Sequence, residues 1–152
     1  MSLDWTQARL FLALMSGSFL AGCAPGPTVV SSSTPHEHVH RSPHGGRLVE
    51  VGEEFAHLEL VWDAEKASLT IYVLDGECES SVRIGQKALQ LVGKGWRGQL
   101  QAIANPLSDE KVGDTSQFAG SLPSLRGRSG SGEVGNLTVN GRTFEHLPVA
   151  YP

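Results

Sequence analysis

The sequence predicts an all-β protein: an antiparallel β-sandwich, immunoglobulin-like, preceded by a signal peptide and a disordered tether. Three observations support this fold class. The chain is rich in turn-forming residues, with 18 glycines and 8 prolines, and only 18% of its residues are charged. Beyond Pro43, short runs repeat the period of two expected of strands, at intervals of about ten residues. No segment after Pro43 keeps a helical period.

The first predicted strands lie between residues 47 and 76. The run at 47–52 alternates weakly, whereas residues 54–63, EFAHLELVWD, alternate clearly. There the apolar face holds Ala56, Leu58, Leu60 and Trp62, and the more polar face includes His57, which is expected to be solvated. A short polar loop and the run SLTIYVLDG at 68–76 complete a predicted hairpin.

Further short strands are predicted at 81–85, 87–93 and 96–104. A loop then begins at Asn105-Pro106, and Pro123 confines any strand in 118–125 to an edge or a bend. The run GSGEVG at 130–135 matches a dinucleotide-binding pattern, but it lacks the preceding buried strand and the following helix. It is therefore predicted to be a flexible loop.

The last predicted element is a hairpin centred on Asn140-Gly141, a dipeptide preferred where both turn residues need positive φ. A two-residue turn pairs Val139 with Arg142 and Leu137 with Phe144, and the same register pairs Gly135 with His146. Directly paired residues share a face of the sheet. His146 is therefore expected at the end of the Leu137/Phe144 face.

The amino-terminal segment indicates export. The apolar run from Leu10 to Leu20 is too short to span a bilayer and has the length of a signal-peptide core. The following LAGC, residues 20–23, resembles the lipobox of bacterial lipoproteins. That resemblance implies cleavage before Cys23 and a lipid anchor on it. Ala24 then favours the outer membrane, periplasmic face, in a Gram-negative cell envelope.

Three regions follow from these features: a lipoprotein signal peptide at 1–22, a flexible Pro/Ser/His-rich tether at 23–42 and a sandwich domain at 43–152. The net charge of −4 and the absence of a basic stripe argue against nucleic acid as a partner.

If Cys23 carries lipid, Cys78 has no intramolecular partner. Glu77 and Glu79 should raise the pKa of this thiol, which is expected to be half-buried and inert rather than a soft metal ligand.

Four of the six histidines lie within residues 36–46. In an extended chain His36, His38 and His40 point the same way, about 6.6 Å apart per step. Together with His44 they supply imidazoles suited to a copper or zinc ion. A polar linker that happens to hold histidines and an acid-sensing tail are the alternatives. No nucleophile is placed beside a base, so we expect no enzyme.

The segment His44-Gly45-Gly46, followed by Gly52, Glu59-Leu60 and the run from Leu69 to Asp75, resembles a known family. These are small exported proteins and amino-terminal parts of heavy-metal efflux adaptors. Residues 118–125 and 137–146 are also similar. The resemblance implies an extracytoplasmic β-sandwich associated with handling copper, zinc or related ions. On that basis His44 is the first ligand candidate and His146 the second.

The function expected from the sequence is therefore that of a membrane-anchored extracytoplasmic lipoprotein. It binds transition-metal ions through His36, His38, His40, His44 and His146, as an accessory to heavy-metal efflux or homeostasis. An efflux adaptor protein would be its partner. The alternative is a non-enzymatic protein-interaction module of the envelope without a metal role.

Overall fold

The computed structural model describes residues 39–151, which form one eight-stranded antiparallel sheet with two short 3-10 helices. The signal peptide, Cys23, His36 and His38 lie outside the described residues. No helix among residues 39–151 is both long enough and apolar enough to cross a membrane. The elements are β1 (Arg47–Val51), β2 (Ala56–Asp63), β3 (Ser68–Asp75), β4 (Ala88–Gly93), β5 (Trp96–Ala102), η1 (Pro106–Ser108), β6 (Gln117–Ser121), η2 (Pro123–Leu125), β7 (Gly130–Val139) and β8 (Arg142–Tyr151).

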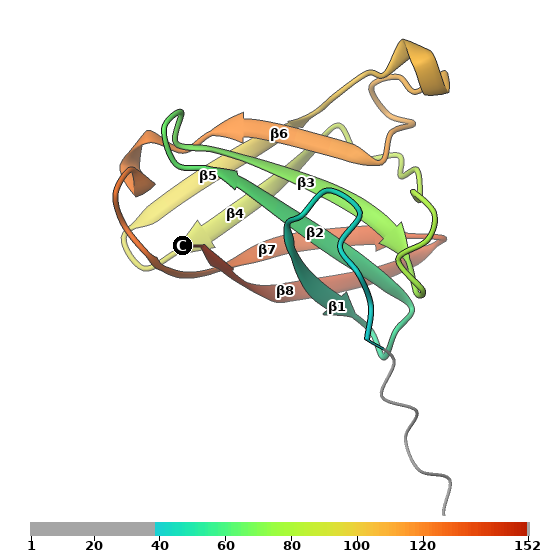
Figure 1. The fold of residues 1–152 in the computed structure, drawn as a ribbon, viewed down its shortest axis with the longest axis horizontal. Coiled ribbons are helices and arrows are strands. Elements are labelled where there is room, and N and C mark those ends of the chain that lie inside the picture. The colour runs from blue at the N-terminus through green and yellow to red at the C-terminus, as the bar shows by residue number, and fades with distance from the viewer. Residues whose placement is uncertain (1–38, 152) are drawn as a thin grey trace, which may run out of the picture. The chain divides into compact units, whose positions relative to one another are not determined.

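The strand order is β1-β2-β3-β6-β5-β4-β7-β8, and the sheet folds over so that its two halves face each other (Figure 1). One layer holds β1, β2, β3 and β6, and the other holds β5, β4, β7 and β8. The pairs Gln101↔Ala119 and Ala102↔Phe118 join the layers through β5 and β6. The predicted all-β antiparallel sandwich is confirmed, and this pairing makes its two layers one continuous sheet.

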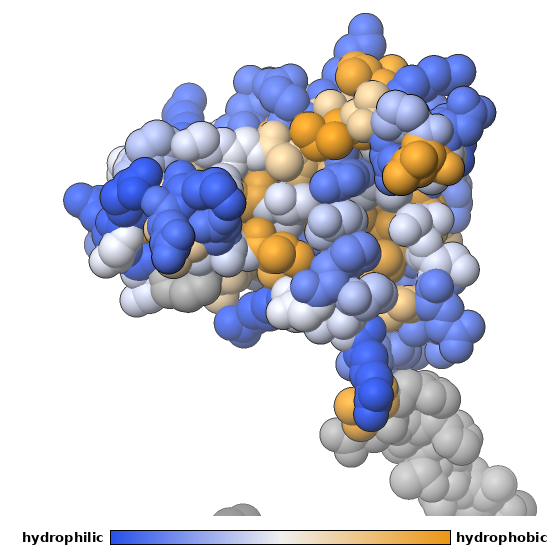
Figure 2. All heavy atoms as spheres, turned by 45° about the horizontal axis from the view of Figure 1, so that its top comes forward, coloured by the Kyte–Doolittle hydropathy of each residue, from blue (hydrophilic) through white to orange (hydrophobic). Residues whose placement is uncertain are grey.

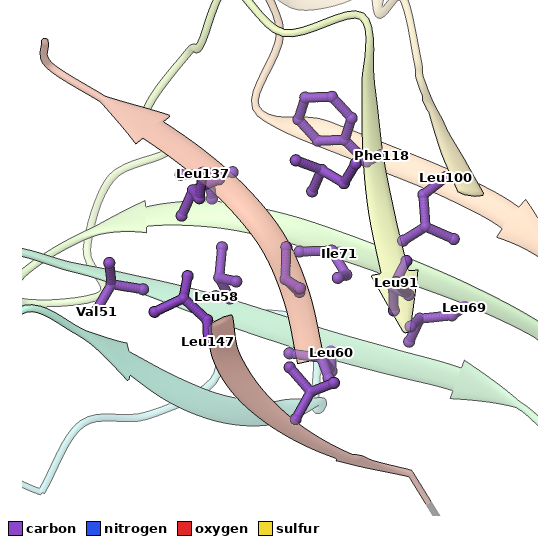
Figure 3. Close-up of a cluster of buried hydrophobic side chains, with 14 of the residues drawn as sticks. Val51, Leu58, Leu60, Leu69, Ile71, Leu91, Leu100, Phe118, Leu137 and Leu147 are labelled. Atoms are coloured by element: carbon purple, nitrogen blue, oxygen red, sulfur yellow. The ribbon is translucent and has the colours of Figure 1, made fainter. Parts of the chain in front are cut away.

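The core lies between the two layers. Leu58, Leu60, Leu69 and Ile71 from β2 and β3 gather with apolar side chains of the other layer (Figure 3). The other layer contributes Leu91, Leu100, Leu137 and Leu147. Each such side chain stabilises the fold by about 1.5–3 kcal/mol when it leaves water. The apolar face predicted for residues 56–62 is confirmed, since Ala56 and Leu58 are fully buried.

Two predicted local structures were wrong. Residues 81–85 form no strand but only two isolated bridges, Leu74↔Ser81 and Ile84↔Thr115. The segment pairs first with the end of β3 and then with Thr115, so it stays beside neither partner long enough to form a strand. The predicted loop at 130–135 is instead the start of β7. A Cβ on Gly132 would lie 2.7 Å from the Trp96 ring and 2.8 Å from the carbonyl oxygen of Val92. Glycine is therefore what allows β7 to approach β4 this closely.

The final hairpin has the predicted register, with Val139 opposite Arg142 and Leu137 opposite Phe144. The predicted face of His146 was wrong. His146 has a φ of +55°, and its side chain is 77% exposed beside Glu133. A left-handed residue interrupts strand alternation, so Leu147, not His146, is the next buried side chain of β8.

Candidate functional site

His44 lies in a tight turn that leads into β1. The backbone N–H of Gly45 donates to the carbonyl oxygen of Ser42 at 3.3 Å, and Gly45 has a φ of +72°. Ser42, Pro43 and Gly45 occupy the first, second and fourth positions of this turn, where serine, proline and glycine are favoured. A sharp turn therefore precedes β1, with His44 at its corner.

Gly46 brings this turn against the outer face of β2. A Cβ at this position would lie 2.5 Å from the carbonyl oxygen of Leu60 and 2.9 Å from Cγ of Glu59. Real side chains do not tolerate such distances, so only glycine fits without a shift of the backbone. The close approach places the N–H of Gly46 within reach of the Glu59 carboxylate.

Glu59 is fully buried on the outer face of β2 and accepts three hydrogen bonds. Its Oε1 accepts from the backbone N–H of His44 at 2.7 Å and from that of Gly46 at 2.8 Å. Its Oε2 lies 2.7 Å from Nδ1 of His44. An ionised carboxylate is an acceptor only, so these three donors match it and offset much of the cost of burying its charge.

The carboxylate also decides which nitrogen of His44 is free. An ionised carboxylate can only accept, so the proton of this contact is assigned to Nδ1, and a neutral ring then has its lone pair on Nε2. The ring stacks on Tyr72, with centroids 3.7 Å apart and planes 5° from parallel, while 38% of the side chain remains exposed. Burial and the charge of Glu59 raise the pKa of Tyr72, so its phenol keeps its proton at neutral pH. His44 is thus an oriented imidazole whose Nε2 can take a ligand.

His44 and Tyr72 line a polar groove of about 280 Å³. Its other lining residues are Ser81, Arg83, Asn105, Ser108, Glu110, Ser116 and Gln117. The side chain of Glu110 is only 5% exposed, and its Oε1 accepts from the backbone N–H of Ser116 at 3.1 Å and from the hydroxyl at 2.6 Å. Nε of Arg83 lies 3.9 Å from the same oxygen.

His40 and His57 form a second contact beneath the same segment. Their ring centroids are 4.7 Å apart, and Nε2 of His40 lies 3.6 Å from a carboxylate oxygen of Glu54. The expectation that His57 is solvated was wrong, since it is only 4% exposed. The chain around His40 and His44 covers this part of the outer face of β2, so a strand face that is polar in sequence is buried in space.

The predicted ligands do not converge in the part of the chain that is described. His40 packs on His57, His44 is held by Glu59, and His146 lies 2.9 Å from Glu133 on β7. Within residues 39–151, no three His, Cys, Asp or Glu side chains are grouped to hold a metal ion. Sequence reasoning missed the role of Glu59, although an acidic residue in the middle of a largely apolar strand was a signal of it.

Cys78 follows β3 in a turn, with a φ of +59° and an exposure of 4%. The predicted increase in its pKa is confirmed, with burial as the largest cause, followed by the charges of Asp75, Glu59 and Glu77. Glu79 does not contribute to this shift, and its backbone N–H donates to the Asp75 carboxylate at 2.9 Å. The thiol is more buried than predicted, which favours the inert form.

Comparisons with protein-family models, with curated proteins and with solved structures find no match to this chain. Fold and site together define its class as an all-β antiparallel sandwich that presents one imidazole fixed by a buried carboxylate.

Proposed function

We propose that this protein is a lipid-anchored, non-enzymatic lipoprotein of the cell envelope that binds transition-metal ions, with Nε2 of His44 as its oriented ligand. The observation that carries the proposal is the 2.7 Å contact between Nδ1 of His44 and Glu59. Metal-binding histidines in proteins almost always donate their other ring N–H to a carboxylate, carbonyl or water, which fixes the tautomer and makes the coordinating nitrogen more basic.

The chemistry of the donors fits a borderline cation such as Zn²⁺ or Cu²⁺, for which imidazole is a suitable ligand. Nε2 of His44 supplies one fixed position, and His36 and His38, a few residues upstream, supply further imidazoles. His40 contributes only if it leaves its contact with His57, and His146 offers a separate exposed nitrogen beside Glu133.

The membrane anchor is proposed from the LAGC sequence, with lipid on Cys23 and the domain facing the periplasm. A tethered ion-binding domain at that place suits a supporting role in heavy-metal efflux, with an efflux adaptor as its partner. Metabolic labelling with a radioactive fatty acid tests the anchor. Label should enter the wild-type chain and not the Cys23→Ala variant, and equal labelling of both would contradict the proposal.

The metal role is tested on the full chain, produced without an affinity tag. Zinc and copper are titrated at neutral pH while the histidine resonances are followed by NMR. The His44 resonances should shift first, and His44→Ala should weaken binding more than the matched exposed variant His146→Ala. A wild-type chain that binds neither metal, or wild-type affinity in His44→Ala, would overturn the metal role of His44.

A protein-interaction module is the second candidate, favoured by the exposure of Leu107. This side chain, in η1, is 99% exposed, and Val112 in the same loop is 56% exposed. The loop projects from the sheet (Figure 1), and apolar groups form separate patches among polar ones on the face in Figure 2. Its backbone is braced, since the N–H groups of Ser108 and Glu110 both donate to the carbonyl oxygen of Asn105. A rigid loop with apolar side chains at its surface lowers the entropy lost on docking.

A photo-crosslinking residue at position 107, compared with one at the exposed position Glu65, tests this candidate in intact cells. A discrete protein adduct specific to position 107 would favour it, and the same products from both positions would argue against it.

A further inference from the structure

The groove beside His44 contains a buried carboxylate that the proposed function has not used. Glu110 lines the groove, is 7% exposed as a residue and lies on the loop between β5 and β6. Its side-chain Oε1 accepts two hydrogen bonds, from the backbone N–H and from the hydroxyl of Ser116. Neither of these bonds uses Oε2, the second oxygen of a carboxylate that belongs to the groove lining.

The charges around the groove favour a cation. Glu110 is in the lining, and Glu59 lies beneath His44. The guanidinium of Arg83 also lines the groove, but its Nη1 lies 3.4 Å from the Asp114 carboxylate and its Nε 3.9 Å from Glu110. Two carboxylates, Glu110 and Asp114, therefore lie against this guanidinium, and the third, Glu59, lies against His44. Charged groups in a partly buried site interact more strongly than in bulk water.

The neutral groups of the lining are suited to water rather than to apolar ligands. They include the hydroxyls of Ser81 and Tyr72 and the amides of Asn105 and Gln117, all of which exchange hydrogen bonds with water. A volume of about 280 Å³ leaves space for several water molecules beside the imidazole, since each occupies about 30 Å³ in the liquid.

We infer that the groove holds the water ligands of a divalent cation bound at Nε2 of His44, with Glu110 as the carboxylate that accepts from them. The inference rests on the proposed function and specifies its ligand as a hydrated divalent ion such as Zn²⁺ or Ni²⁺. Cu⁺, a soft ion that prefers thiolate and thioether ligands, would gain little from such a groove. Outer-shell groups of this kind typically change metal affinity by about 10-fold to 100-fold.

The test compares two variants of the full chain that each lose one carboxylate charge. Glu110→Gln keeps an amide oxygen to accept from Ser116, while it removes the charge from the groove. Glu65→Gln removes a charge from the exposed loop between β2 and β3, outside the groove lining. Zinc affinity should fall about tenfold in Glu110→Gln and remain near that of the wild type in Glu65→Gln. Cu⁺ affinity should change in neither.

A gain-of-affinity variant keeps the inference testable if Glu110→Gln fails to fold. Gln117→Glu adds a carboxylate to the lining without altering the loop and should tighten zinc binding. Zinc that shifts the His44 resonances with wild-type affinity in Glu110→Gln, or no gain in Gln117→Glu, overturns this inference and leaves the proposed function intact. Zinc that does not affect His44 in the wild-type chain overturns the proposed function itself.

Discussion

The imidazole of His44 lies flat on the phenol ring of Tyr72, with ring centroids 3.7 Å apart and planes 5° from parallel. Together with the Glu59 carboxylate this contact fixes both the rotation and the tautomer of the ring. Glu59 and Tyr72 are direct cross-strand neighbours on β2 and β3, so a sheet pair provides both supports. The orientation of His44 thus depends on strand register as well as on its own turn.

Replacing Glu59 with glutamine should reverse the tautomer of His44. The amide oxygen can keep the two backbone donors, and the amide NH₂ then faces Nδ1, which must become the acceptor. We expect the ring proton to move to Nε2, together with a loss of about 1–3 kcal/mol in the free energy of unfolding. Nitrogen-15 chemical shifts of His44 and urea unfolding measure these two effects. Glu50→Gln, on β1, is the control, and unchanged His44 shifts in Glu59→Gln would contradict the assignment.

Substituting alanine for Gly46 should displace the turn from β2. The new methyl group would meet the carbonyl oxygen of Leu60 at 2.5 Å, and overpacking of this kind costs about 1–3 kcal/mol. Gly45→Ala has open space around it but a φ of +72°, so its cost is backbone strain of about 1–2 kcal/mol. Only Gly46→Ala should also lose the Nδ1–H signal of His44. Retention of that signal would show that the turn tolerates a side chain there.

The stability of the protein should fall in alkaline solution because the pKa of Tyr72 is raised by burial and by the charge of Glu59. The neutral phenol is favoured in the folded state, so its contribution is fully present below the unfolded pKa of about 10. It is lost as the pH rises through the higher folded value. Urea unfolding between pH 8 and 11 should show this decline, and Tyr72→Phe should show a smaller one. Identical slopes would contradict the prediction.

Cys78 should react slowly with iodoacetamide. Burial, followed by the charges of Asp75, Glu59 and Glu77, raises the pKa of its thiol, which lowers the fraction of reactive thiolate at any given pH. The rate is measured in a Cys23→Ser background, where Cys78 is the single remaining cysteine. Asp75→Asn should accelerate the reaction, whereas Glu65→Gln, in the loop between β2 and β3, should not. A rate equal to that of the urea-unfolded chain would contradict the burial of this thiol.

Local patterns in the sequence predicted much of the fold. The alternation from Ala56 to Trp62 and the Asn140-Gly141 turn depend on neighbouring residues alone, and both appear as predicted. The turn at His44 likewise depends on local residues, because Pro43 and Gly45 occupy turn positions that favour them. These features follow from backbone geometry and short-range periodicity, which depend only on residues that are close together in the sequence.

Tertiary structure decided what those patterns left open. His57 is buried because the chain around His40 and His44 packs over β2. Gly132 can pair with β4 because it has no side chain to collide with the Trp96 ring. The outward turn of His146 comes from one left-handed residue. The contact of His44 with Glu59 joins residues 15 positions apart. The sequence alone therefore determined the class of fold and nominated His44, but the partner that orients this imidazole depends on which chain segment covers which face of the sheet.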